Sequence, residues 1–209
     1  MADWVTISSL ATAGGTLVLG VATFASVKSA NRAARVAEIS VMSGLRPLLM
    51  PSRLDDPDQK VGFMEGEWLI VHGGRGAAGV SETAVYLAMS VRNVGAGIAV
   101  LHAWRVEPGR SRPTGPSALE DLTRLTRDIY VPAGDVGFWQ GTFRDPSSQA
   151  FIEVKRAVEE RAELTVEVMY GDLEGGQRTI TRFMMSPRPD GEYIVTAGRV
   201  WNIDRADPR

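Results

Sequence analysis

A run of uncharged residues, 4–27, constrains this chain more than any other feature of its sequence. As a helix the run is about 36 Å long, which exceeds the hydrocarbon core of a bilayer, about 30 Å. In lipid a helix satisfies its own backbone groups, so it is the structure expected there. The sequence therefore predicts a transmembrane anchor over residues 1–27, in contact with the lipid bilayer.

Two other identities of this run stay open. A cleaved signal peptide normally has a positive segment first, but only Met1, Ala2 and Asp3 precede the run. The run also exceeds the usual apolar region of about 7–15 residues, although residues 23–25 resemble a cleavage site. The second alternative is a buried core helix of a soluble domain. The anchor is the favoured interpretation.

Small side chains recur along the anchor every seven residues, at Ser8, Gly15 and Ala22. Such a stripe allows a second transmembrane helix to approach closely. The hypothesis is that the anchor packs against another membrane protein or against a second copy of the chain. The simpler interpretation is that small residues are so frequent in this segment that some stripe must arise.

Basic residues follow the anchor and none precedes it. Lys28, Arg32 and Arg35 lie within eight positions, and the positive-inside rule puts that side in the cytoplasm. The chain contains no cysteine, in agreement with a reducing compartment. We expect a single-pass protein of the cell (inner) membrane, with its N-terminus outside and its large domain cytoplasmic. The three basic side chains also lie at headgroup level, where contact with anionic lipid is the alternative to a purely topological role.

Composition then divides the rest of the chain. Residues 28–44 are rich in alanine and continue the anchor as a helical stalk that stops at Ser43-Gly44 before Pro47. Residues 45–204 form one domain, and residues 205–209 form a flexible tail. Beyond residue 27, 23 basic side chains face 24 acidic ones, so nothing indicates nucleic acid as a partner.

The domain has a β pattern with short apolar runs and turn residues between them. We expect a mainly β fold, an antiparallel sandwich of about nine strands with two inserted helices. Ser117 and Glu120 have the spacing of a capping box and predict a short helix. Asp145 followed by Pro146 predicts the start of a second helix, which ends near Ala162 and buries Ala150, Phe151, Val154, Ala157 and Val158.

The strands at 84–93 and 98–107 flank Asn93-Val-Gly-Ala-Gly97, a tight connection. The pattern Asn93-x-Gly95-x-Gly97-x-Ala99 resembles the turn of uncharacterised single-pass membrane proteins from high-GC, actinobacterial-type bacteria. The resemblance implies an immunoglobulin-like β-sandwich behind an N-terminal transmembrane segment. Ile98 stands where that family usually has proline. The resemblance supplies no catalytic residues.

Three patterns suggest chemistry, and each has a simpler explanation. Gly74, Gly76 and Gly79 fit a dinucleotide fingerprint, but a strand rather than a helix follows, so a mobile glycine loop is expected. The acidic residues at 55, 56 and 58 lack the spacing of a calcium loop and predict a solvated turn. His72 and His102 lie on separate strands, so together they could supply at most two metal ligands, and His102 is interpreted as a core or interface histidine. The sequence predicts no catalytic residues, no metal and no cofactor.

The tryptophans Trp68, Trp104, Trp139 and Trp201 lie in apolar strands and are expected in the core. Phe138 and Trp139, which glycines flank, are the exception that would suit an exposed surface for a partner. The favoured function is a membrane-tethered interaction or scaffold module at the cytoplasmic face. The alternative is a membrane-bound enzyme or small-ligand-binding domain with an unrecognised pocket.

Overall fold

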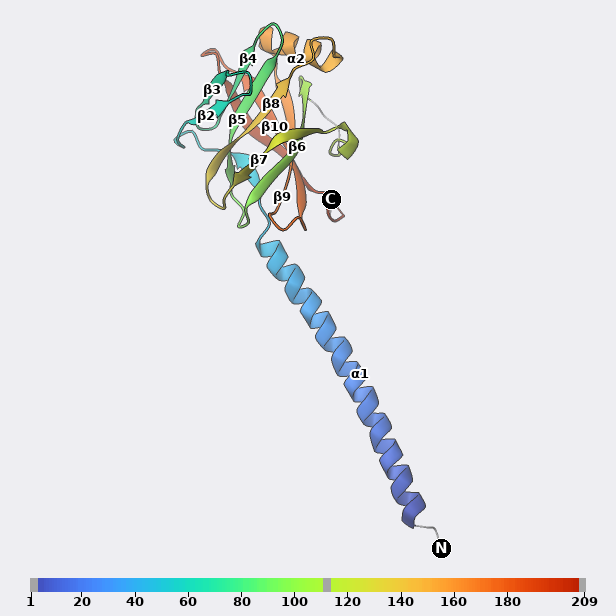
Figure 1. Ribbon diagram of the computed structural model, residues 1–209. Helices are drawn as coiled ribbons and strands as arrows, with labels where there is room; N and C mark the ends of the chain where they lie inside the picture. Colours follow the sequence, from blue (N-terminus) through green and yellow to red (C-terminus); the bar gives the residue numbers. More distant parts are fainter. Residues whose placement is uncertain (1–3, 111–113, 207–209) are drawn as a thin grey trace. The chain divides into compact units, whose positions relative to one another are not determined.

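A computed structural model describes the backbone of residues 4–110 and 114–206, with side chains from residue 12 onward except Ser43. The chain divides into two compact units, Met1–Gly44 and Leu45–Arg209. Figure 1 shows that the first unit is a long helix and the second a mainly β domain. The first unit therefore ends at Gly44.

The first unit is a single helix, α1, that spans Trp4–Gly44 without a break. Its segment Thr12–Met42 is long and apolar enough to cross a membrane, with a mean hydropathy of 1.2. The hydroxyls of Thr16 and Thr23 donate to the carbonyls four residues earlier, at 2.8 and 2.7 Å. These bonds satisfy the polar side chains within the helix itself, so they are compatible with lipid.

The second unit contains eleven strands in its described residues, two more than the pattern predicts. Eight of them form a continuous antiparallel sheet in the order β8-β5-β4-β11-β10-β9-β6-β7, β1 pairs with β5 beside β4, and β2 and β3 form a separate hairpin. The strands are β1 Leu49–Pro51, β2 Gln59–Gly62, β3 Trp68–Val71, β4 Arg75–Val80, β5 Val85–Asn93, β6 Ala99–Pro108, β7 Thr123–Val131, β8 Val136–Phe143, β9 Leu164–Gly171, β10 Arg178–Pro187 and β11 Tyr193–Asn202.

The large sheet curls until its two end strands, β7 and β8, contact each other. Arg127 of β7 donates to the side-chain oxygen of Gln140 of β8 at 2.6 Å. The concave face encloses a core whose largest members, among them Trp139, Tyr170 and Phe183, have no exposed surface. This curled antiparallel sheet, visible in Figure 1, confirms the mainly β fold class and is consistent with a sandwich or half-barrel. The immunoglobulin-like connectivity stays a prediction.

Strand β5, which pairs with β1, β4 and β8, is buried on both of its faces. Leu87 and Met89 point into the main core, whereas Tyr86 and Ala88 belong to a second cluster under the β2–β3 hairpin. A strand with one solvated face alternates apolar and polar residues, but a strand covered on both faces does not. The continuous run of apolar and aromatic residues at 84–89 is the consequence of this double cover.

The predicted mobile glycine loop at 73–79 is wrong, because most of it is strand β4. A Cβ at Gly76 would lie 2.5 Å from the Met185 side chain and 3.2 Å from the carbonyl oxygen of Ala88 on β5. Gly74 has a φ of +66°, in the left-handed region that glycine adopts readily. The glycines thus permit close packing and a tight turn.

Both helix starts differ from their sequence predictions. Helix α2 spans Gln149–Glu159 with Ser148, not Asp145, as its N-cap. It buries Phe151, Val154 and Ala157 as expected, but Ala150 is exposed. The capping box yields only a 3₁₀ turn, Leu119–Asp121, because the amide of Ser117 donates to Glu167 of β9 at 2.9 Å instead.

The Asn93–Gly97 segment joins two strands that do not pair with each other, since β5 pairs with β1, β4 and β8 and β6 with β7 and β9. The first residues of the domain, 45–48, pack against this segment. The buried Asn93 side chain accepts from the amides of Leu48 and Gly95, both at 3.0 Å, and donates to the carbonyls of Gly97 and Val131 at 2.6 and 3.0 Å. The segment 45–48 therefore enters the fold across this turn.

Gly95 and Gly97 leave room for that segment, which yields a stability prediction. A Cβ on Gly95 would overlap the carbonyl of Arg46 and the amide nitrogen of Leu48. We expect Gly95→Ala to lower the free energy of unfolding by about 2 kcal/mol or more, as steric overlap with backbone does. Chemical denaturation of the full chain in detergent, followed by tryptophan fluorescence, measures the loss. Gly115→Ala is the matched control, because a Cβ there meets nothing within 4 Å; equal stability of the two variants would contradict this account.

Candidate functional site

The residues predicted to face lipid or another helix lie on α1. Gly15, Ala22, Lys28, Arg32 and Arg35 are all exposed there. The side chain of Ser8 lies outside the described part of the structure. The three basic residues lie along one side of the helix together with Glu38. Packing of the small-residue stripe and the orientation across the membrane both stay predictions.

The predicted partner surface at Phe138 and Trp139 does not form. Trp139 is completely buried and lies edge-on to Trp104, with ring centroids 5.6 Å apart. Phe138 is partly buried, with the Arg127 guanidinium 5.5 Å from its ring centroid. Core packing requires glycine at positions 137 and 141. A Cβ on Gly137 would lie 2.8 Å from the Val131 side chain, and a Cβ on Gly141 would lie 2.8 Å from the Trp139 side chain.

Trp68, which the sequence predicts to lie in the core, is instead exposed. Trp68 and Ile70 of β3 are each 58% exposed, and Met64 in the β2–β3 turn is 82% exposed. These residues share one side of the hairpin with Lys60 and Gly62 of β2. We call this set, Lys60, Gly62, Met64, Trp68 and Ile70, the hairpin surface.

Cross-strand pairing makes the hairpin surface continuous. Gly62 lies directly opposite Trp68, and Lys60 opposite Ile70. The indole covers Gly62 so closely that a Cβ there would lie 2.8 Å from the ring, and the Lys60 ammonium lies 4.8 Å from the ring centroid. Large apolar side chains that cluster on a solvated face commonly mark an interaction site.

The opposite side of the hairpin is packed against the domain. Val61 and Val71 are buried, and the Phe63 ring contacts that of Tyr86 on β5 with centroids 4.9 Å apart. At the turn, Glu65 forms an ion pair with Arg144, which follows β8. The hairpin is thus fixed by apolar burial along its length and by charge at its closed end.

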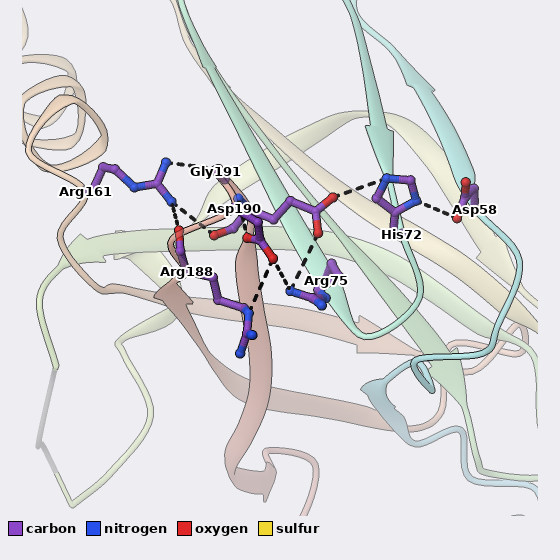
Figure 2. Close-up of polar contacts among 8 residues, drawn as sticks. Asp58, His72, Arg75, Arg161, Arg188, Asp190 and Gly191 are labelled. Carbon is purple, nitrogen blue, oxygen red and sulfur yellow. Dashed lines mark hydrogen bonds and ion pairs between the residues drawn. The ribbon is translucent and has the colours of Figure 1, made fainter.

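A polar cluster fixes the open end of the hairpin (Figure 2). His72 follows β3, and its Nδ1 lies 2.7 Å from a carboxylate oxygen of Asp58, which precedes β2. Its Nε2 lies 3.2 Å from Glu192 in the β10–β11 turn, and Glu192 also pairs with Arg75 of β4 at 3.6 Å. Arg75 reaches Asp190 of the same turn at 3.3 Å. The imidazole therefore connects both strand ends to the large sheet.

Arg161, which follows α2, holds the β10–β11 turn in place. The Arg161 guanidinium donates to the carbonyls of Gly191, Arg188 and Glu192 at 3.0, 2.5 and 3.3 Å (Figure 2). Its backbone has a φ of +55°, the left-handed position that glycine usually occupies after a helix. The three hydrogen bonds offset the strain of a non-glycine residue there, and they keep Glu192 beside His72.

Two of the three acidic residues at 55–58 form ion pairs with protein groups. Asp56 pairs with Arg92 of β5, and this hydrogen-bonded guanidinium keeps the pKa of Asp56 below its usual value. Asp58 pairs with His72. In the part of the chain that the structure describes, no three His, Asp or Glu side chains converge as metal ligands. The interpretation of this segment as a cation loop has no support.

The hairpin surface escapes sequence reasoning for a specific reason. Residues 68–71, Trp-Leu-Ile-Val, are all apolar, so no alternation indicates which side is exposed. The alternation is visible only in β2, where Lys60 and Gly62 flank Val61. Comparison of the chain with protein-family models and with curated proteins finds no match.

The position of His72 between two carboxylates predicts a pH dependence. Its hydrogen bond to Asp58, with further attraction from Asp58 and Glu192, raises the pKa of His72 above 6.5, although burial and Arg75 oppose the rise. The folded state therefore binds this proton more tightly than the unfolded chain. The resulting stabilisation is complete below pH 6.5 and is lost as the pH rises through the folded-state pKa.

Comparison of the full chain with His72→Gln in detergent tests this expectation. The difference in their unfolding free energies should shrink as the pH rises above 6.5 through the folded-state pKa of His72, and the protection factors of the hairpin amides, which correct for the intrinsic exchange rate, should fall. His102→Gln is the control, because burial and Arg178 lower the pKa of His102, so its contribution changes in the opposite direction. A pH-independent difference for His72→Gln would contradict the role of the imidazole.

Proposed function

We propose that the chain is a membrane-tethered interaction module that binds another membrane protein through the hairpin surface. The observation that supports this proposal is the exposure of Trp68, Ile70 and Met64 on one side of a hairpin whose other side is buried. Because the polar cluster and the Glu65–Arg144 pair fix the two ends, this surface is presented in one orientation. Such preorganisation lowers the entropic cost of binding.

The charge on the hairpin surface indicates the chemistry of the partner. Lys60 makes no ion pair among the described residues, and its ammonium lies over the Trp68 ring. A second copy of the chain would bring two such ammonium groups into one small interface, which like-charge repulsion disfavours. We therefore infer a different protein, which offers apolar side chains beside a carboxylate that pairs with Lys60.

The membrane anchor explains how so small a surface can be sufficient to bind a partner. The surface comprises five residues, far fewer than the roughly 20–30 residues per side of a standard stable interface. Confinement in the same bilayer raises the effective concentration of a membrane partner to about the millimolar range. A weak contact is then enough for recruitment, and it remains reversible.

Photo-crosslinking in membranes tests the proposal. A photoreactive amino acid in place of Met64, in the full chain, should give one adduct with a membrane protein. Trp68→Ser together with Ile70→Ser should reduce that adduct by about tenfold or more, because buried aromatic anchors dominate such contacts. Lys60→Glu should reduce it as well.

Leu173→Ser is the matched control, since Leu173 is also 58% exposed but lies between β9 and β10. Its adduct should equal that of the parent chain. Gly15→Leu tests the contribution of the anchor separately from that of the domain, because a large side chain blocks close helix approach without altering the hairpin. An adduct that survives loss of Trp68 and Ile70, or that consists of two copies of this chain, would overturn the proposal.

The proposed location is the cytoplasmic face of the cell membrane, with the N-terminus outside. It rests on the asymmetry of Lys28, Arg32 and Arg35 around the anchor. Alkaline phosphatase, which becomes active only after export, should be inactive when fused after Arg209. An active fusion would put the domain, and its partner, on the other side of the membrane.

A further inference from the structure

A pocket of about 350 Å³ lies on the large sheet, where β7 diverges from β6. Among its lining residues, His102 lies on β6, Arg124 and Asp128 come from β7, and Arg178 begins β10. The remaining lining residues are Leu101, Ala103, Leu125 and Met169. The pocket shares no residue with the hairpin surface, so a ligand bound here would act independently of the proposed interaction.

An interruption of the sheet creates this pocket. In the β6–β7 ladder, Leu101 pairs with Ile129 and Ala103 with Arg124, so His102 alone lies opposite the four residues 125–128. The ladder from β6 to β9 shifts register at the same place. Bulges of this kind redirect a side chain and are frequent beside functional sites.

The backbone opposite His102 is shaped to admit its ring. A Cβ on Gly171 of β9 would lie 3.0 Å from His102 Nε2 and 2.6 Å from the carbonyl oxygen of Gln177. Any larger residue at position 171 would therefore displace the imidazole. The imidazole of His102 therefore packs against the backbone of Gly171 and lines the pocket.

The cationic groups of the pocket are available to a ligand. Arg124 and Arg178 are exposed, and neither guanidinium makes a hydrogen bond or ion pair with another described residue. This contrasts with Arg46, Arg75 and Arg92, each of which pairs with a carboxylate. Asp128 is the single acidic group of the lining, and it accepts from the Tyr130 hydroxyl at 3.3 Å.

We propose that this pocket binds the phosphate group of a small molecule between Arg124, His102 and Arg178. Guanidinium groups donate two parallel hydrogen bonds to phosphate oxygens, and two such groups on separate strands suit the several oxygens of one phosphate. The pocket volume is at the lower end of the range of ligand pockets, about 300–1,000 Å³. Asp128 favours a ligand that carries a hydroxyl or amine next to the phosphate.

His102 supplies an observable that a purely structural residue would not. Burial and the nearby Arg178 lower the pKa of His102, although Asp128 and Asp172 oppose this shift. A bound phosphate dianion favours the imidazolium, so it should raise this pKa toward or above its ordinary value. The chain contains only two histidines, so the two titrations are readily separated by NMR.

The test uses the full chain in detergent micelles with inorganic phosphate as the probe. His102 should titrate below pH 6.5 without phosphate and at higher pH when phosphate is saturating, whereas the His72 titration should not move. Titration to about 10 mM phosphate is sufficient to detect a Kd of about 1 mM. Arg124→Ala and Arg178→Ala should each weaken the affinity by about tenfold or more, as loss of charge-assisted hydrogen bonds does.

Arg156→Ala is the matched control, because Arg156 is an exposed arginine of α2 that does not line the pocket. It removes the same charge and should leave phosphate affinity unchanged. Equal losses in all three arginine variants would show general electrostatic attraction and overturn the site, as would the absence of any saturable change at His102. Glycerol 3-phosphate in solution and phosphatidate in nanodiscs distinguish the source of the phosphate: the arm that shifts the His102 titration identifies a soluble ester or a lipid headgroup.

Discussion

Burial of both faces of β5 is the constraint on which the rest of the domain depends. The inner face packs on Trp139 and the curled sheet, and the outer face packs under the β2–β3 hairpin through Tyr86 and Ala88. A strand as apolar as β5 is stable only where both sides are dry. The hairpin is therefore needed by the core, and this need explains why a separate two-stranded sheet persists beside a continuous one. An isolated hairpin is at best marginal in water, so its stability comes from this shared apolar contact.

That dependence also explains how the hairpin presents apolar residues to solvent. Val61 and Val71 are committed to the cluster on β5, so the strand period of two directs Lys60, Trp68 and Ile70 outward. A shift of one residue would reverse the two sides, but it would also separate Asp58 from His72 and Glu65 from Arg144. The ion pairs at the two ends thus fix the register and, with it, the composition of the exposed face.

The sequence predicts well what depends on local pattern and poorly what depends on distant partners. The long apolar helix, its continuation to Gly44 and the burial of Phe151, Val154 and Ala157 in α2 follow from composition and from spacings of three and four, and these are found, whereas Ala150 is exposed. The exposure of Trp68 and the burial of Trp139 depend on which strands cover which faces, and the positions of apolar runs do not contain that information. The same holds for Gly95 and Gly97: the turn is visible in the sequence, but the segment 45–48 that passes across it is not. The His102 pocket arises from a register shift among three strands, for which no local sequence signal exists.

The two histidines show how one fold gives the same residue opposite properties. His72 is half exposed but lies between Asp58 and Glu192, which stabilise its charged form. His102 is more enclosed and lies near Arg178, which destabilises its charged form. A charged His72 strengthens its existing contacts with Asp58 and Glu192, so protonation of His72 stabilises the attachment of the hairpin. Asp128 and Asp172 only partly offset Arg178 and burial at His102, and in the proposed site an anion from outside the chain would add the charge that pairs with Arg124 and Arg178.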